Sequence, residues 1–323
     1  MSLNGPALIT GALGQDGFIL SYALRARGRE VVGVVRPGAA GGRRRVLEAL
    51  GCRLVEIDLA APAPLADLAA EAKPASIFHL AAAHLASGSE ETPAVWRAMT
   101  AVNQQATEIL AQAALKLGSA LVYASSSQIW TAREAEHVAD EATPPDPSTF
   151  YGRTKIAAAD MLAHARNHQG LKASVAILFN HESAWRSPSF VTRKISMAAA
   201  RAARGDKARL ALANIGARTD WQAASDAVEA LLLMAGADVP GDYVLGSGRS
   251  HAVRDFVRVA FDHVGLPWQD SVAAARDEAG PVLVGRSDKA RRDLGWRPVR
   301  DFAAVVHEMV DADLARLDGA RED

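Results

Sequence analysis

The sequence has few of the features that mark membrane, disulfide-rich or nucleic-acid-binding proteins. Its single cysteine, Cys52, excludes a disulfide within the chain, and no thiolate metal cluster is expected. No apolar run reaches the roughly 18 residues that a membrane span needs. The formal net charge of -1 provides no overall field that would attract nucleic acid or a membrane surface. The N-terminus lacks the basic stretch and apolar core of a signal peptide, so we expect a cytoplasmic protein.

Apolar segments alternate along the first half of the chain. Hydrophobic residues make up 49% of the 323 residues and charged residues 23%, as in globular proteins with a sizeable core. Strand patterns alternate with helical patterns, which predicts an α/β fold with a doubly wound parallel sheet of the Rossmann type. The strands are expected at residues 7–10, 31–35, 53–57, 76–80, 120–124 and 173–178, and the main helices at 18–27, 94–117 and 151–168. The loop at 131–149 is expected to lack regular structure, because it contains three prolines.

A glycine-rich turn lies between the first strand pattern and the first helical pattern. Gly11, Gly14 and Gly17 would allow a tight turn and let a pyrophosphate approach the backbone at the helix N-terminus. We therefore predict a dinucleotide cofactor here, the alternative being a plain tight turn. The next strand ends at Arg36, where an NAD site usually has an acidic residue. Because arginine suits a phosphate, Arg36 favours NADP, whereas the arginines at 43–45 could equally form a solvated helix face.

The alternation changes after residue 178, which predicts a domain boundary. Residues 1–178 are expected to form the NADP-binding Rossmann domain. Residues 179–323 are expected to form mainly a smaller C-terminal α/β substrate lobe, with room for some segments to return to the first sheet. This lobe should hold a basic helix at 190–204, a helix at 225–235 capped by Ser225 or Asp226, a strand at 243–245 and a last helix at 301–317. No flexible linker separates the lobes, so we expect them to pack together with the substrate between them.

Three side chains suggest proton transfer. Tyr151 and Lys155 are one helical turn apart, so they share a helix face. The cation is expected to lower the pKa of the phenol and make it a proton acceptor near neutral pH. Ser126, just after a strand, could hydrogen-bond the same substrate oxygen. These groups could move a proton on or off a sugar or alcohol hydroxyl while a hydride moves elsewhere. His79 and His84 flank a neighbouring turn, and the sequence assigns neither a role.

The motifs together resemble the extended short-chain dehydrogenase/reductase superfamily and, within it, the GDP-mannose 4,6-dehydratase family. The glycine turn and Y-x-x-x-K are shared by the superfamily, whereas the segment from Leu178 to Ile195 is specific to the family. The resemblance covers almost the whole chain. It rests on A-L-I-T-G-A-L-G-Q-D-G at 7–17, V-V-R at 34–36, L-F-N-H-E-S at 178–183, F-V-T-R-K-I at 190–195, D-W at 220–221 and L-G-W-R-P at 294–298.

The resemblance implies an enzyme with tightly held NADP, a GDP-hexose substrate and a homodimeric or homotetrameric assembly, formed partly through helices like those at 94–117 and 151–168. Enzymes of this family oxidise the sugar 4-hydroxyl, remove water across the 5,6-bond and return the hydride to the 6-position. By resemblance the cofactor would be lined by Thr10, Gly11, Gly14, Gln15, Asp16, Gly17, Arg36, Asp58, Leu59, Leu80, Ala81, Tyr151, Lys155, His181 and Arg186. The nucleotide sugar would be approached by Ser126, Asn180, Lys194, Arg218 and Arg276.

The chain departs from the family at the catalytic glutamate. The family has Thr-Ser-Glu where this chain has Ser126, Ser127 and Gln128. In the dehydratase that glutamate removes the 5-proton and helps expel the 6-hydroxyl, whereas an amide does not take up a proton near neutral pH. Redox chemistry at the 4-position therefore stays possible, while the elimination loses its acid/base group.

Further departures lie where the sugar and the nucleotide would bind, so both ends of the substrate are expected to differ. The arginine that precedes Asp-Trp in the family is Thr219 here, and the adjacent Arg218 could replace it. The family's Arg-Pro-x-Glu reads R-D-E-A at 276–279, its Pro-Arg-Arg-Gly reads A-W-R-S at 184–187, and its Gln-Ser after the fourth strand is replaced by H-L-A-S at 84–87.

Three functional interpretations follow. The favoured one is an NADP-dependent enzyme acting at the 4-position of a nucleotide sugar, as a 4-keto reductase or epimerase, with Ser126, Gln128, Tyr151 and Lys155 at its catalytic site. The second is a 4,6-dehydratase that uses another base, or whose Gln128 is an engineered change. The third is a non-catalytic NADP-binding sensor or scaffold. The intact Tyr151 and Lys155 argue against it, because a sensor needs no proton relay.

Overall fold

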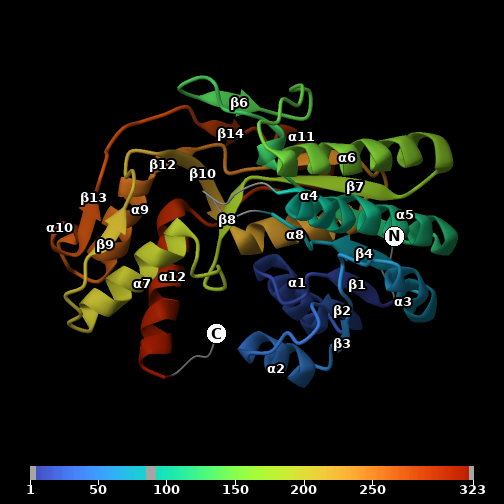
Figure 1. Ribbon diagram of the computed structural model, residues 1–323, viewed down its shortest axis with the longest axis horizontal. Coiled ribbons are helices and arrows are strands. Elements are labelled where there is room, and N and C mark those ends of the chain that lie inside the picture. Colours follow the sequence, from blue (N-terminus) through green and yellow to red (C-terminus); the bar gives the residue numbers. More distant parts are fainter. Residues whose placement is uncertain (1–4, 85–91, 320–323) are drawn as a thin grey trace.

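The computed structural model describes residues 5–84 and 92–319 (Figure 1). At its centre is a seven-stranded sheet in the order β11-β7-β5-β4-β1-β2-β3, and every neighbouring pair is parallel. The strands are β1 (Ala7–Thr10), β2 (Val31–Val35), β3 (Arg53–Glu56), β4 (Ser76–His79), β5 (Ala120–Ser126), β7 (Ala173–Leu178) and β11 (Asp242–Leu245). The doubly wound parallel sheet predicted from the sequence is confirmed.

Helices cover both faces of this sheet, because its strands are apolar on both sides. Leu8 and Leu121 point into one core and their neighbours Ile9 and Val122 into the other. The first core is closed by α3 (Pro64–Ala72), α5 (Ala106–Leu117) and α6 (Phe150–Gln169). The second is closed by α1 (Gln15–Ala26), α2 (Gly42–Ala49), α8 (Ala224–Gly236) and α11 (Asp288–Leu294). Because all seven strands are parallel, their carboxyl ends lie along one edge of the sheet, where ligands of such folds bind.

The long helix expected at 94–117 is present but is not uniformly α-helical. It consists of α4 (Pro93–Thr100), a π-helical segment η1 (Ala101–Gln105) and α5. The π-helical segment contains Asn103, whose side chain is completely buried. Single π-helical turns inside α-helices often mark functional sites.

The smaller lobe packs around a third core, formed by α7 (Val191–Ala203), α9 (Val253–His263) and α12 (Phe302–Leu317). Its main sheet has the order β12-β10-β8, with β8 (Asn180–Glu182), β10 (Arg218–Ala223) and β12 (Ser250–Ala252). A short strand β9 (Leu210–Leu212) pairs with β13 (Val272–Ala274), next to the single turn α10 (Trp268–Ser271). In Figure 1 this lobe lies to one side of the large sheet, with β8 and β10 between them.

The strand at 243–245 and the helix at 225–235 are segments of the second half that return to the large sheet. They are β11, which pairs with β7, and α8, which closes the second core. Two local predictions are wrong. Neither Ser225 nor Asp226 caps α8, which begins after Ala223 without a side-chain cap. The carboxylate of Asp226 instead accepts hydrogen bonds from the backbone of Val299 and Arg300, at 2.9 and 3.0 Å. The loop at 131–149 contains β6 (His137–Ala139), which pairs with β14 (Leu283–Gly285), because its prolines begin only at 144.

No helix in the described part of the chain is both long and apolar enough to cross a membrane.

Candidate active site

Ser126, Tyr151 and Lys155 come together where β5 ends and α6 begins. Ser126 is the last residue of β5, and α6 starts after Thr149, whose hydroxyl accepts a hydrogen bond from the Gly152 amide at 3.0 Å. Tyr151 is half-buried and forms a side-chain hydrogen bond with Ser126. Lys155 is almost fully buried, with its Nζ 5.5 Å from the centre of the Tyr151 ring. The grouping predicted from the sequence spacing is therefore present in the fold.

Gln128 is held against the first turn of the same helix. Its backbone amide donates to the Ser126 hydroxyl at 3.2 Å, within the short 3₁₀ turn η2 (Ser127–Ile129). A Cβ added to Gly152 would overlap the carbonyl oxygen of Gln128 and lie 2.9 Å from Pro147. Only glycine allows this close approach. The backbone of Gln128 is thus fixed beside Tyr151, while its side chain is exposed.

The electrostatics differ from the sequence prediction for Tyr151. Burial raises the pKa of Tyr151 to about 12, against the lowering effect of its hydrogen bond with Ser126. Burial also lowers the pKa of Lys155 to about 7. The prediction that Lys155 lowers the pKa of Tyr151 is therefore wrong, because loss of solvent around the phenol dominates and Lys155 is itself only partly charged near pH 7. In this structure Tyr151 is a protonated phenol at neutral pH, which suits it to donate a proton.

Asn103, which was not predicted from the sequence, connects α6 to the loop after β4. Its side-chain amide bonds the backbone amide and carbonyl of Ala83, each at 3.0 Å. The same amide donates to the hydroxyl of Thr154 at 3.0 Å, and that hydroxyl donates to the carbonyl of Tyr151 at 2.7 Å. A lone asparagine within an apolar helical pattern was the available signal. Buried polar groups of this kind are retained where they are fully hydrogen-bonded.

The two unassigned histidines have different surroundings. His79 is completely buried: its Nδ1 lies 2.6 Å from the hydroxyl of Thr10, and burial together with Lys155 lowers its pKa to about 3. It is a neutral structural residue. His84 is exposed, and its ring lies edge-on to Tyr151, with 6.2 Å between ring centres. His84 is therefore a second titratable group at the site.

The glycine-rich turn has the backbone geometry that a pyrophosphate requires. Gly11 has φ +72°, and a Cβ on it would lie 3.0 Å from the backbone of Ala81. A Cβ on Gly17 would collide with Gly11 and lie 2.8 Å from Ala12, so glycine is needed for helix α1 to pack against the turn. Helix α1 begins directly after Gly14, without a side-chain cap, so its first amides can meet an anion. These observations fit a dinucleotide at this turn.

Side chains from the first and second lobes meet beside this turn. Nε2 of His181 lies 3.0 Å from the carboxylate of Asp16, and Gln15 donates to the His181 carbonyl at 2.9 Å. Ser183 donates to Gln15 at 2.9 Å. Burial opposes charge here, but the mutual attraction outweighs it, so the pKa of Asp16 is lowered and that of His181 is raised. These hydrogen bonds, in which predicted cofactor residues take part, thus join β8 to the start of α1.

The other predicted cofactor residues divide into accessible and buried groups. Arg36 directly follows β2 and is exposed, and its guanidinium has no hydrogen bond or ion pair with another described residue, so this side chain can receive a phosphate. Asp58 is also exposed, and Leu80 and Ala81 are partly so. The side chain of Thr10 and that of Leu59 are buried, so neither can make an open side-chain contact.

Arg186 occupies the segment between β8 and α7. Its guanidinium stacks on the ring of Phe190 at 3.6 Å and forms an ion pair with buried Glu182 at 3.2 Å. Burial raises the pKa of Glu182 against the opposing effect of Arg186. The positive charge of Arg186 therefore compensates the carboxylate of Glu182 between β8 and α7.

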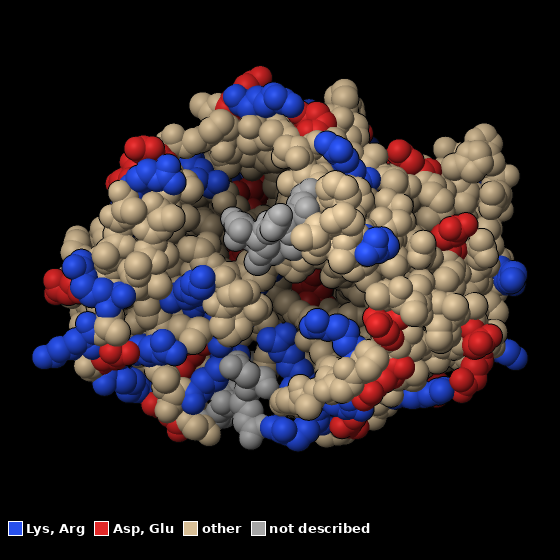
Figure 2. All heavy atoms as spheres, viewed as in Figure 1, with Lys and Arg blue, Asp and Glu red and all other residues tan. Residues whose placement is uncertain are grey.

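The residues predicted to bind the substrate do not all lie around one cavity. Lys194 lines a cavity of about 210 Å³ between α7 and β9, which Arg201 and Arg209 also line. Arg218 instead hydrogen-bonds Ser250, at 2.8 Å from Nη2. Asn180 and Arg276 are exposed and lie on other segments. Figure 2 shows the surface hollowed between the lobes, with basic side chains along its lower rim.

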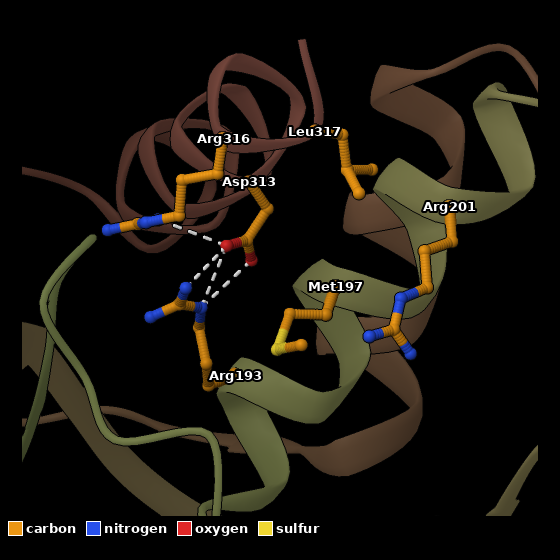
Figure 3. A pocket seen from close by; sticks show the side chains of 6 residues that line it. All are labelled: Arg193, Met197, Arg201, Asp313, Arg316 and Leu317. Atoms are coloured by element: carbon orange, nitrogen blue, oxygen red, sulfur yellow. Dashed lines mark hydrogen bonds and ion pairs between the residues drawn. The ribbon is translucent and has the colours of Figure 1, made fainter. Parts of the chain in front are cut away.

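A second cavity, of about 190 Å³, lies between α7 and α12 (Figure 3). Asp313 is at its centre and pairs with Arg193 at 2.7 Å and with Arg316 at 3.0 Å. Because none of its lining residues comes from β5 or α6, we assign this ion-pair cluster to the packing of the two helices. No group of three or more His, Cys, Asp or Glu side chains in residues 5–84 and 92–319 could hold a metal ion.

Comparison with known proteins identifies the family. The family model described as GDP-mannose 4,6 dehydratase matches residues 8–309. GDP-mannose 4,6 dehydratase 1 of Arabidopsis thaliana is 35% identical over 95% of this chain and 89% of that protein. GDP-mannose 4,6-dehydratase of Sinorhizobium fredii is 32% identical, over 98% of both chains.

Solved structures share the fold. A UDP-glucose 4-epimerase of Thermus thermophilus, in complex with NAD, has a TM-score of 0.81 at 24% identity and covers 95% of this chain and 98% of its own. RMD of Pseudomonas aeruginosa, complexed with NADPH, has a TM-score of 0.76 at 21% identity and covers 97% of this chain and 100% of its own. With its Rossmann sheet and its Tyr151/Lys155 pair, the chain belongs to the GDP-mannose 4,6-dehydratase family of extended short-chain dehydrogenase/reductase enzymes.

Proposed function

We propose that this protein is an NADP-dependent enzyme that carries out redox chemistry at the 4-position of a GDP-linked hexose, with reduction of a 4-keto sugar as the favoured reaction and 4-epimerisation as its variant. The observation that carries the proposal is the grouping of Ser126, Tyr151 and Lys155 beside an amide, Gln128, instead of a glutamate. The family's substrate class supports the GDP-hexose, and the lost carboxylate argues against elimination.

The protonation state of Tyr151 supports reduction. With its pKa raised to about 12, the phenol carries its proton at neutral pH and can donate it to a 4-oxygen as hydride reaches the 4-carbon. Ser126, which is hydrogen-bonded to Tyr151, can hold the same oxygen. Lys155 can then restore the proton, because its own pKa of about 7 lets it give up or take up a proton at neutral pH. A bound nicotinamide would supply the hydride.

The cofactor preference follows from the end of β2. The exposed guanidinium of Arg36 suits a 2′-phosphate, and no acidic residue occupies that position to bind a ribose 2′-hydroxyl. The glycine-rich turn of Gly11, Gly14 and Gly17 would hold the pyrophosphate. NADP is therefore preferred over NAD in this proposal.

The nucleotide end of the substrate would lie in the cavity between α7 and β9. Lys194, Arg201 and Arg209 line it and can neutralise a diphosphate. Arg209 is held by the carbonyls of Gln269 and Val272, so its position is fixed. In this proposal Asn180 and Arg276 approach the sugar and the diphosphate, while Arg218 would have to release Ser250 to do so.

The proposed assembly is a homodimer or homotetramer in the cytoplasm. Trp96 on α4 is 41% exposed and stacks on Phe150 of α6, with 5.2 Å between ring centres. An exposed tryptophan that stacks on a half-buried phenylalanine of the neighbouring helix is a natural anchor for a second copy of the chain.

Incubation with defined nucleotide sugars tests the proposal. GDP-4-keto-6-deoxymannose with NADPH should give a product that gains two hydrogen atoms in mass, with NMR signals of a new 4-hydroxyl stereocentre, whereas UDP-sugars should be left unchanged. Turnover of no nucleotide sugar, together with normal NADPH binding, would instead support the sensor or scaffold interpretation.

A 4,6-dehydratase is the second candidate, because the family model and the relatives bear that name. It predicts the loss of one water from GDP-mannose by the wild-type enzyme. That wild-type reaction separates the two candidates, and the variant Gln128→Glu tests whether the missing carboxylate limits dehydration. Because the side chain of Gln128 is exposed, the carboxylate can be accommodated, and we expect dehydration to appear or to rise by about 100-fold.

A further inference from the structure

The loop after β4 brings a second titratable ring to the catalytic tyrosine. The ring of His84 lies 6.2 Å from that of Tyr151 and 6.4 Å from that of Phe190, measured between ring centres. Tyr151 is on α6 and Phe190 is at the start of α7, so His84 lies between the two lobes. A ring in this position faces the space where a sugar held by Tyr151 would lie.

The residue that anchors the segment before His84 also anchors the first turn of α6, which carries Tyr151. Asn103 holds both backbone groups of Ala83, the residue before His84, at 3.0 Å each. It also holds Thr154, which bonds the carbonyl of Tyr151. The backbone next to each of the two candidate proton-transfer groups is therefore anchored to the same residue. Preorganisation of this kind is what proton transfer to a bound substrate requires.

The chemistry of the imidazole suits the function that Gln128 cannot perform. The charged and titratable groups that face His84 are Tyr151 and Lys155 on α6 and Arg186 before α7. Burial lowers the pKa of His84, and the charges of Arg186 and Lys155 lower it further. The ring is therefore neutral at pH 7 and can accept a proton, and it is exposed enough to meet a substrate.

We propose that His84 is the carbon-acid base of this enzyme, removing a proton from a carbon next to the sugar's 4-carbonyl. This inference rests on the proposed function, because a 4-keto sugar must be bound. The C–H bond breaks, the proton moves to an imidazole nitrogen, and the electron pair moves into an enolate whose oxygen is held by Tyr151 and Ser126. The imidazole then exchanges its proton with solvent and returns a solvent hydrogen to the same face of that carbon, so the hydrogen is exchanged with retention of configuration. No oxidant or further reactant is needed.

Deuterium exchange tests the step separately from hydride transfer. The wild-type enzyme and GDP-4-keto-6-deoxymannose are incubated in D₂O, and deuterium on the carbons next to the carbonyl is followed by mass and NMR, with the enzyme-free rate subtracted. NADPH oxidation with the same sugar is measured in parallel. His84→Gln should lower the exchange rate by about 10²–10⁴-fold while NADPH oxidation falls by less than about threefold.

Two controls exclude a purely structural explanation. His164→Gln changes an exposed histidine on α6 and should leave both rates unchanged. The wild-type exchange rate should fall as the pH drops through the lowered pKa of His84, because a protonated imidazole cannot accept a proton. In the His84→Gln variant, the remaining exchange rate should not fall over the same pH range.

The outcomes separate the two proposals. A wild-type enzyme that oxidises NADPH without exchanging deuterium, or a His84→Gln variant that exchanges at the wild-type rate, overturns the role of His84 and leaves the reductase intact. A wild-type enzyme that does neither with this sugar overturns the proposed function, and the role of His84 with it.

Discussion

Lys155 donates a hydrogen bond from its Nζ to the backbone carbonyl of Ala124, at 2.7 Å. This bond ties the first turns of α6 to the end of β5, and it brings an ammonium group into a site where burial lowers its pKa to about 7. Burial of this ammonium group lowers stability, which is a common cost at functional sites, and we propose that Lys155 acts in such a site.

Replacement of Lys155 by methionine should stabilise the fold and abolish activity. The shift of the lysine pKa from 10.5 to about 7 corresponds to a penalty of at most about 5 kcal/mol, at about 1.4 kcal/mol per unit. Loss of the bond to Ala124 offsets about 1.5–3 kcal/mol of that gain. We therefore expect Lys155→Met to raise the free energy of unfolding by roughly 2 kcal/mol at pH 7, as measured by urea denaturation without cofactor.

The pH dependence of this difference is a separate check. Between pH 7 and 10.5 the unfolded lysine binds a proton that the folded one has lost, so the wild type gains stability as the pH rises. The advantage of Lys155→Met should be largest at and below pH 7 and shrink toward pH 10. An advantage that stays constant over this range would contradict the lowered pKa.

Removal of the Tyr151 hydroxyl should separate catalysis from binding. Tyr151→Phe keeps the ring beside His84 and loses the proton donor, so we expect the rate of NADPH-dependent reduction to fall by about 10²–10⁴-fold. NADPH affinity, measured by fluorescence titration, should change little. Tyr22→Phe is the matched control, because Tyr22 is 56% exposed on α1. Full activity in Tyr151→Phe would remove Tyr151 from the catalytic site.

The packing of Gly152 against Gln128 predicts a strong effect of one methyl group. In Gly152→Ala the Cβ would overlap the carbonyl of Gln128, and backbone on both sides would have to move. We expect a loss of about 1–3 kcal/mol in stability and about 100-fold in activity. Gly280→Ala is the control, since nothing lies within 4 Å of its added Cβ and its φ is not positive. Equal effects of the two substitutions on melting temperature and activity would disprove the packing argument.

The cofactor preference predicts the outcome of changing Arg36. Arg36→Asp removes a guanidinium that has no other described partner, so the fold should be unaffected. Loss of a charge-assisted bond to a phosphate, worth about 1.5–3 kcal/mol, should weaken NADPH binding by about 10–100-fold and leave NADH binding equal or stronger. Arg45→Ala, from the arginine triplet on α2, should change neither value much. Calorimetric titration with both cofactors measures this, and a wild-type preference for NAD would defeat the argument.

The sequence by itself determined the architecture, because the signals of a doubly wound sheet are local. Each buried strand is a short apolar run and each crossover helix has its own periodicity, so their alternation predicted a parallel, doubly wound sheet. The spatial order of the strands comes from the structure. The four-residue spacing of Tyr151 and Lys155 placed both on one helix face. The position of Ser126 just after a strand predicted that it would lie at the same site. The loss of the family's glutamate at Gln128 is also a property of the sequence alone.

Only the tertiary structure decided the electrostatics and the long-range contacts. The pKa values of Tyr151 and Lys155 depend on how much water the packed helices exclude, which no spacing reveals. Strand β11 joins the large sheet, and Asn103 reaches Ala83 and Thr154, through contacts between segments far apart in the chain. In the sequence, His84 is an isolated histidine without an assigned role. Only the fold places its ring beside Tyr151, because the contacts of a side chain depend on packing and not on its sequence neighbours.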